Sequence, residues 1–165
     1  MRKKTMTNGE ISSLHQILGL LLGQSNIPLK FVISKNTKLL EEKVSAYESK
    51  RDEIFREAVK IDEKGNPCLL PEHKDQEGKH QVPYVCYEYN SPEAYEEMLN
   101  KLNSLAKETH DVELFTEKAS RMIKVSVEKE GKIVYTETSI EEILEDPNNN
   151  IKSGVVMTLT EYMLD

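Results

Sequence analysis

The segment spanning residues 29–60 contains neither glycine nor proline, and no other feature limits the fold of this chain so strongly. Apolar or aromatic side chains recur at every seventh position along it and just past its end: Ile33, Leu40, Tyr47, Ile54 and Ile61. Seven residues complete two turns of an α-helix, so these side chains share one face. The pattern predicts a helix on the order of 45 Å long that packs lengthwise along another helix. Residues 29–33 also alternate as a strand would, so the start of the helix is left open.

Three shorter helices are predicted where a capping side chain precedes an apolar repeat of helical spacing. They cover residues 9–22, residues 92–107 and a short segment that begins at a capping box on Ser139 and stops at Pro147. Residues 155–164 fit either a helix or a strand, and periodicity does not decide between the two.

Strands are predicted where β-branched and aromatic residues gather or alternate with polar ones. These segments are 3–6, 82–89 and 112–115, together with a hairpin formed by 123–127 and 133–136. A turn over 62–67 and an irregular polar loop over 68–81 lie between the long helix and the second of these strands.

The length of 165 residues is typical of a single domain. We predict an α+β fold in which long, hairpin-like helices pack with a small, mostly antiparallel sheet. Its helical part covers about residues 8–61 and its α+β part about residues 62–165. The longest apolar run, residues 17–22, is far too short to cross a bilayer, so no membrane association is expected.

Charge is distributed unevenly along the chain. Residues 1–60 carry a net charge of +4, whereas residues 61–165 carry −11. Because nucleic-acid binding depends on Lys and Arg displacing counterions from phosphates, we expect no direct binding to nucleic acid. The acidic cluster of Glu141, Glu142 and Glu145 offers a different possibility, in which carboxylates mimic phosphates and contact a DNA-binding protein.

Sequence motifs of common enzymes are absent. The chain has no GxGxxG, GxxxxGK[ST], HExxH or GxSxG motif, and its seven glycines are scattered. We therefore expect a protein that is not an enzyme and that needs no cofactor.

Four side chains could together bind a metal: Cys68, His73, His80 and Cys86. Two thiolates and two imidazoles suit a tetrahedral Zn²⁺ site, but structural zinc ligands are usually closer in sequence than these. The alternative is two reduced cysteines near the predicted strand and two surface histidines. With no CxxC motif and no secretory signal, the thiols indicate a cytoplasmic protein.

Polar residues interrupt the apolar stripe of the long helix. Asn36 and Arg51 occupy positions where apolar residues are expected, and Tyr47 lies beside Arg51 on that face. They are candidates for contacting a partner or for setting helix register. Alternatively, Arg51 extends past Tyr47 to water and Asn36 caps a kink. An uncovered part of the stripe predicts self-association through the long helix.

One resemblance is carried by several motifs. They are Asn8-Gly9-Glu10, Ile27-Pro28-Leu29-Lys30, Ser34-Lys35-Asn36, Leu40, Tyr47, Arg51, Asp62-Glu63-Lys64-Gly65-Asn66-Pro67, and segments 93–114 and 159–163. In these the chain resembles small uncharacterised proteins encoded by tailed phages and prophages. The likeness covers about half of the chain, and residues 68–89 and 121–150 look like additions to the shorter family pattern. It implies a viral origin, a bacterial cytoplasm as the location, and no particular activity.

These observations predict a non-enzymatic phage or prophage accessory protein that binds a host or viral protein. Two other functions are kept open: an acidic mimic of nucleic acid that blocks a DNA-binding protein, and a small zinc-stabilised module or metal-dependent enzyme.

Overall fold

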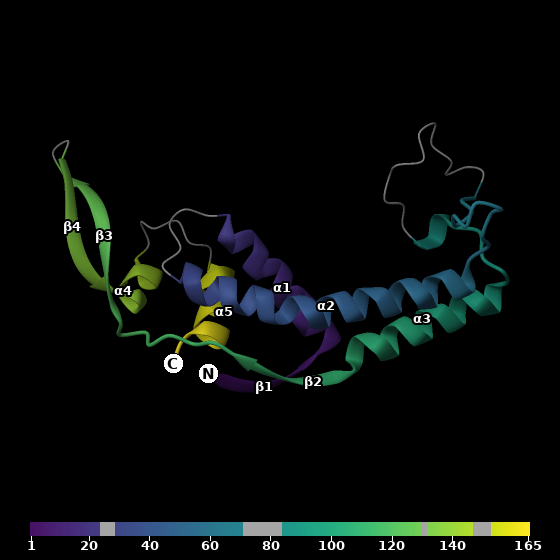
Figure 1. Ribbon diagram of the computed structural model, residues 1–165, viewed down its shortest axis with the longest axis horizontal. Helices are drawn as coiled ribbons and strands as arrows, with labels where there is room; N and C mark the ends of the chain where they lie inside the picture. The colour runs from purple at the N-terminus through teal and green to yellow at the C-terminus, as the bar shows by residue number, and fades with distance from the viewer. Residues whose placement is uncertain (24–28, 71–83, 130–131, 147–152) are drawn as a thin grey trace. The chain divides into compact units, whose positions relative to one another are not determined.

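The computed structural model describes residues 1–23, 29–70, 84–129, 132–146 and 153–165. They form an α+β fold, as predicted, with helices and two antiparallel two-stranded sheets (Figure 1). Contacts divide the chain into two compact units, which are described separately: Met1–Val44 with Thr109–Asp165, and Ser45–Glu108. We call them the terminal unit and the central unit.

This division differs from the predicted helical part, 8–61, and α+β part, 62–165. The boundary falls within the long helix, between Val44 and Ser45. The reason is strand pairing between distant segments, because the first strand of the chain pairs with residues of its second half. Residues from both ends of the sequence therefore build one core.

The terminal unit contains most of the elements. They are β1 (Arg2–Thr7), α1 (Asn8–Leu22), the first part of α2 (Lys30–Ala58), β2 (Thr109–Leu114), β3 (Met122–Lys129), β4 (Lys132–Ser139), α4 (Ile140–Glu145) and α5 (Ser153–Met163). Strands β1 and β2 pair antiparallel from Arg2 opposite Leu114 to Thr7 opposite Thr109. Strands β3 and β4 form the predicted hairpin.

The core of the terminal unit explains two choices that the sequence left open. Residues 30–33 are helical rather than extended, because Leu29, Val32 and Ile33 are buried together at helical spacing. The C-terminal segment is a helix for the same reason, since Leu159 and Met163 lie one turn apart and are both fully buried.

Local capping sets two of the helix starts in this unit. Thr7 caps α1 and Ser139 caps α4, and each forms a capping box with a glutamate three residues later. Because Thr7 is the cap of α1, Asn8 is itself the first helical residue, one position before the predicted start at residue 9.

The central unit contains the remainder of α2, a short 3₁₀ helix, η2 (Tyr84–Cys86), and α3 (Pro92–Lys107), which runs back alongside α2 (Figure 1). The predicted turn after the long helix is present. The carboxylate of Asp62 accepts from the backbone N–H groups of Lys64 and Asn66, and Gly65 adopts a φ of 83°, which favours glycine.

The predicted strand over 82–89 is wrong for the described residues 84–89. Tyr84–Cys86 form η2, and the following residues make only single bridges, Leu69 with Tyr87 and Val59 with Tyr89. The physical reason is that the tyrosines here pack against helices rather than against a sheet face. The ring centroids of Phe55 and Tyr87 lie 4.8 Å apart.

Candidate functional site

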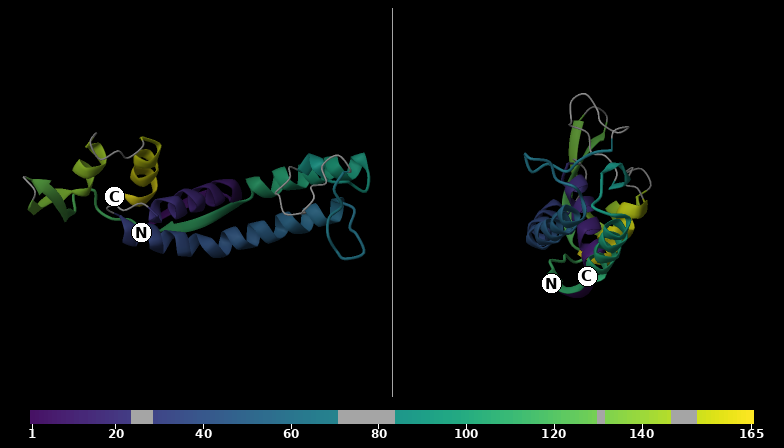
Figure 2. Two further views of the ribbon diagram at one scale, coloured as in Figure 1. Left: turned by 90° about the horizontal axis from the view of Figure 1, so that it is seen from above. Right: turned by 90° about the vertical axis from the view of Figure 1, so that its right-hand side faces the viewer.

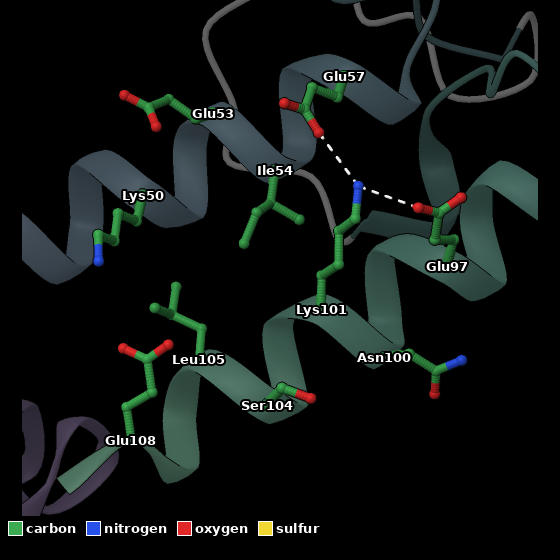
Figure 3. A pocket seen from close by; sticks show the side chains of 10 residues that line it. All are labelled: Lys50, Glu53, Ile54, Glu57, Glu97, Asn100, Lys101, Ser104, Leu105 and Glu108. Atoms are coloured by element: carbon green, nitrogen blue, oxygen red, sulfur yellow. Dashed lines mark hydrogen bonds and ion pairs between the residues drawn. The ribbon is translucent and has the colours of Figure 1, made fainter.

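A groove lies between α2 and α3 of the central unit (Figure 3). Its volume is about 540 Å³, and we call it the α2–α3 groove. It is lined by Lys50, Glu53, Ile54, Glu57, Glu97, Asn100, Lys101, Ser104, Leu105 and Glu108. All ten residues belong to the central unit, so the groove depends on the geometry of that unit alone.

The floor of the α2–α3 groove is apolar. Ile54 from α2 and Leu105 from α3 point toward each other across it (Figure 3). Ile54 is half-buried and keeps most of the apolar surface of the floor, whereas Leu105 is buried and lines the floor beneath it. Apolar side chains of this kind can receive the anchor residues of a bound segment.

One lysine bridges the two walls of the groove. The Lys101 ammonium on α3 lies 3.0 Å from a carboxylate oxygen of Glu97 and 3.3 Å from one of Glu57 on α2. The hydrogen bond to Glu97, followed by that to Glu57, raises the pKa of Lys101 above its usual value. Lys101 is therefore held in its charged form between two carboxylates.

Three further charges lie on the rim. Within the described part of the chain, the side chains of Lys50, Glu53 and Glu108 form no ion pair. The lining has four glutamates and two lysines, so its formal net charge is −2. An acidic rim around an apolar floor favours a ligand that combines apolar anchors with positive charge.

An aromatic cluster connects α2 to segment 84–89 of the central unit. Phe55 of α2 contacts the rings of Tyr84 and Tyr87, with centroids 5.3 Å and 4.8 Å away. Two of the predicted partner-binding residues belong to this cluster. Arg51 donates a hydrogen bond of 3.0 Å to the hydroxyl of Tyr84, and its guanidinium lies 5.5 Å from the ring centroid of Tyr47. Arg51 and Tyr47 thus have structural contacts within the central unit.

A second pocket of the central unit, about 490 Å³ in volume, lies beside Tyr87, Tyr89 and Tyr95. The Tyr89 hydroxyl donates to the carbonyl of Tyr84 at 2.6 Å, and burial raises the pKa of Tyr89 to about 12. Its hydroxyl thus stays protonated at neutral pH and serves the fold.

Asn36, the third predicted residue of the long helix, is fully buried in the terminal unit. Its side-chain amide is satisfied by the backbone of Phe115 and by the sulfur of Met163. It therefore holds elements of the core together and presents no surface to a partner in this structure.

The three glutamates of the predicted acidic cluster, on α4, have different roles. Glu142 accepts hydrogen bonds from the hydroxyl of Thr138 and the backbone N–H of Ser139. These bonds, with that from Thr138 the largest influence, lower the pKa of Glu142. Glu141 and Glu145 are exposed and remain available as surface charge.

The candidate metal site lies partly outside the described residues, because His73 and His80 are not among them. Cys68 and Cys86 are free thiols; Cys86 is buried and Cys68 half-buried. Backbone hydrogen bonds from Leu70 to Cys86 and from Glu88 to Cys68 hold their two segments side by side. In the ranges that the structure describes, no cluster of three metal-ligating side chains occurs.

Sequence reasoning missed the groove as a site. The pair Glu97 and Lys101, four residues apart on α3, is visible as a helix-surface ion pair. The contact between Lys101 and Glu57 cannot be seen in the sequence. Lys101 and Glu57 are 44 positions apart, and only the fold brings them together.

No described helix is both long and apolar enough to cross a membrane. Comparison with protein-family models, with curated proteins and with solved structures finds no match to this chain.

Proposed function

We propose that this chain is a non-enzymatic protein that acts by binding another protein, and that the α2–α3 groove receives an amphipathic helix of that partner. The observation that carries this proposal is the apolar floor of Ile54 and Leu105 enclosed by an acidic rim. Two helices that leave apolar side chains between them offer the seat that a third helix fills in a bundle.

The charges of the groove specify the chemistry of the partner. Its helix carries apolar residues at i, i+3 or i+4 and i+7, which contact the floor. Lysines or arginines flank these residues and contact Glu53 and Glu108, whose carboxylates form no ion pair among the described residues. By the resemblance described above, we propose that the partner is a host or viral protein in a phage-infected or lysogenic bacterium.

Two designed helical peptides test this proposal directly. Both carry the same apolar stripe, but one has lysine and arginine on its flanks and the other has glutamate. We expect the basic peptide to bind by calorimetry and to shift the backbone NMR signals of Ile54, Ser104 and Leu105. The acidic peptide should bind much more weakly, because it places like charges against the rim.

Matched charge reversals provide the control. The double variant Glu53→Lys, Glu108→Lys changes the groove, whereas Glu48→Lys, Asp52→Lys makes the same change in charge on exposed residues of α2 that do not line it. Only the first pair should weaken binding of the basic peptide. Equal weakening by both pairs, or signal shifts confined to residues outside the groove, would contradict the proposed site.

A further inference from the structure

The β3–β4 hairpin is a sheet of only two strands. Among the residues that the structure describes, no other strand pairs with the outer edge of β3 or of β4. The hairpin extends away from α1 and α5 of the same unit, and its base lies near α4 (Figures 1 and 2). Two-stranded sheets are marginally stable in water, and a free edge exposes backbone groups that can pair with another strand.

One face of this hairpin carries exposed apolar side chains beside charged ones. Ile133 and Tyr135 of β4 are 69% and 71% exposed, and Met122 of β3 is 56% exposed. The register places all three on the same face, because Met122 is opposite Ser139 and side chains two residues apart share a face. Lys124 and Glu137 lie between Met122 and Tyr135 on this face, so the adjacent exposed apolar side chains are Ile133 and Tyr135. Two exposed apolar side chains beside a free strand edge mark an interaction surface.

We propose that the outer edge of β4 pairs with β4 of a second copy of this chain, antiparallel, about a twofold axis at residue 134. A twofold axis perpendicular to a sheet leaves each side chain on its own face, so odd residues pair with odd and even with even. With the axis at residue 134, Ile133 of each copy lies opposite Tyr135 of the other. Pairs of a β-branched and an aromatic residue stabilise antiparallel strands.

The neighbouring registers are poorer. An axis at Tyr135 places Ile133 opposite Glu137, and an axis at Thr136 places Tyr135 opposite Glu137. Each sets a carboxylate against an apolar or aromatic side chain twice in the dimer. An axis at Ile133 pairs only residues 132–134 of β4 and leaves Tyr135 without a partner in that strand. The register about residue 134 pairs residues 132–136 and sets no carboxylate against an apolar side chain, so it is the register that β4 favours.

The strand that pairs with the outer edge of β4 belongs to a second copy of this chain, because the favourable cross-strand pairs form between two β4 strands. Pairing of the two edges produces a four-stranded sheet in the order β3-β4-β4-β3, which satisfies backbone groups along the central edge. It also gathers Ile133 and Tyr135 of both copies into one apolar cluster.

Sedimentation velocity over a series of protein concentrations tests the proposal. We expect a reversible dimer, and we expect Tyr135→Glu to raise its dissociation constant about tenfold, because two cross-strand pairs are lost. Met157→Glu is the matched control, since Met157 is also 71% exposed but lies on α5. A monomer at every concentration, or equal effects of the two substitutions, would overturn the proposal.

A double variant tests the register itself. In Ile133→Lys, Tyr135→Glu, the new lysine of each copy lies opposite the new glutamate of the other, so dimerisation should recover relative to Tyr135→Glu alone. Failure to recover overturns the register about residue 134. Hydrogen exchange of the wild-type protein needs no substitution. Within residues 132–136, the backbone amides that do not pair with β3 should exchange more slowly at high protein concentration, and exchange independent of concentration would contradict edge pairing.

Discussion

The side-chain amide of Asn36 donates to the backbone carbonyl of Phe115 and accepts from the backbone N–H of the same residue, both at 2.8 Å. The Asn36 side chain thereby replaces the strand partner that Phe115 lacks, one residue beyond the end of β2. Asn36 is thus a polar residue in the apolar stripe of the long helix because its side chain hydrogen-bonds the backbone N–H and carbonyl groups of Phe115.

Replacement of Asn36 by leucine should destabilise the protein although leucine is apolar and similar in size. The substitution leaves the N–H and carbonyl groups of Phe115 without their partner, which costs about 2–4 kcal/mol in the free energy of unfolding. Chemical denaturation measures the loss. The exposed neighbour Lys38 is the control, and Lys38→Ala should change stability by less than about 0.5 kcal/mol. A stable Asn36→Leu variant would show that Phe115 finds water or another partner.

The capping carboxylate of Glu142 should make stability depend on pH in the acidic range. Its pKa is lowered in the folded protein, so the stabilisation is present above its ordinary value of 4.5 and is lost as pH falls through the lower folded value. Wild type should therefore melt at a higher temperature than Glu142→Gln at neutral pH. The difference should shrink as pH falls through the lowered folded pKa of Glu142, because its side chain then becomes neutral like that of glutamine.

The neighbouring substitution Glu141→Gln serves as the control for this titration. Glu141 is also in the first turn of α4 but does not cap Ser139. A pH profile of melting temperature for Glu141→Gln should stay closer to the wild-type profile than that of Glu142→Gln. If the two variants behave alike, the capping bonds of Glu142 do not control the pH dependence.

Binding of the basic helical peptide to the α2–α3 groove should weaken as salt concentration rises. The rim glutamates are exposed, and charges at the protein surface are screened over about 8 Å at physiological ionic strength. The apolar floor should preserve part of the affinity at high salt. Calorimetry over a range of salt concentrations, with Glu53→Lys, Glu108→Lys as comparison, measures both contributions.

The same experiment separates the groove from the acidic cluster of α4. Reversal of charge at Glu141 and Glu145 should leave the peptide affinity unchanged, because these residues belong to the terminal unit and do not line the groove. A loss of affinity as large as that caused by the groove substitutions would instead support the hypothesis of an acidic mimic of nucleic acid.

The two cysteines should react with thiol reagents at different rates. Cys68 is half-buried whereas Cys86 is only 6% exposed, so Cys68 should be modified first in the native protein. Reaction with Ellman's reagent, followed for wild type, Cys68→Ser and Cys86→Ser, assigns the fast and slow phases of thiol modification.

Elemental analysis of untagged protein should find zinc well below one equivalent. Stoichiometric zinc that protects both thiols would support the metal site instead.

Local sequence determined most of the secondary structure. The absence of glycine and proline over residues 29–60 and the cap at Ser91 correctly predicted α2 and α3. The alternation in β3 and β4 correctly predicted the hairpin. These signals are reliable because capping, backbone freedom and face periodicity act over a few residues and need no distant partner.

Other features depended on residues far apart in the chain. The same apolar residues allowed helix or strand for α5, and burial of Leu159 and Met163 in the core of the terminal unit selected the helix. The tyrosines of segment 84–89 have strand propensity, yet their packing against Phe55 overrides it.

The candidate site also depends on contacts between residues that are far apart in the chain. The sequence alone determined that α2 and α3 are helices and that Glu97 and Lys101 share a face of α3. Only the tertiary structure decided that Ile54 faces Leu105 and that Lys101 reaches Glu57. Helical periodicity specifies which side chains point in one direction, whereas the contacts between two helices depend on how the intervening segment folds and on which faces pack.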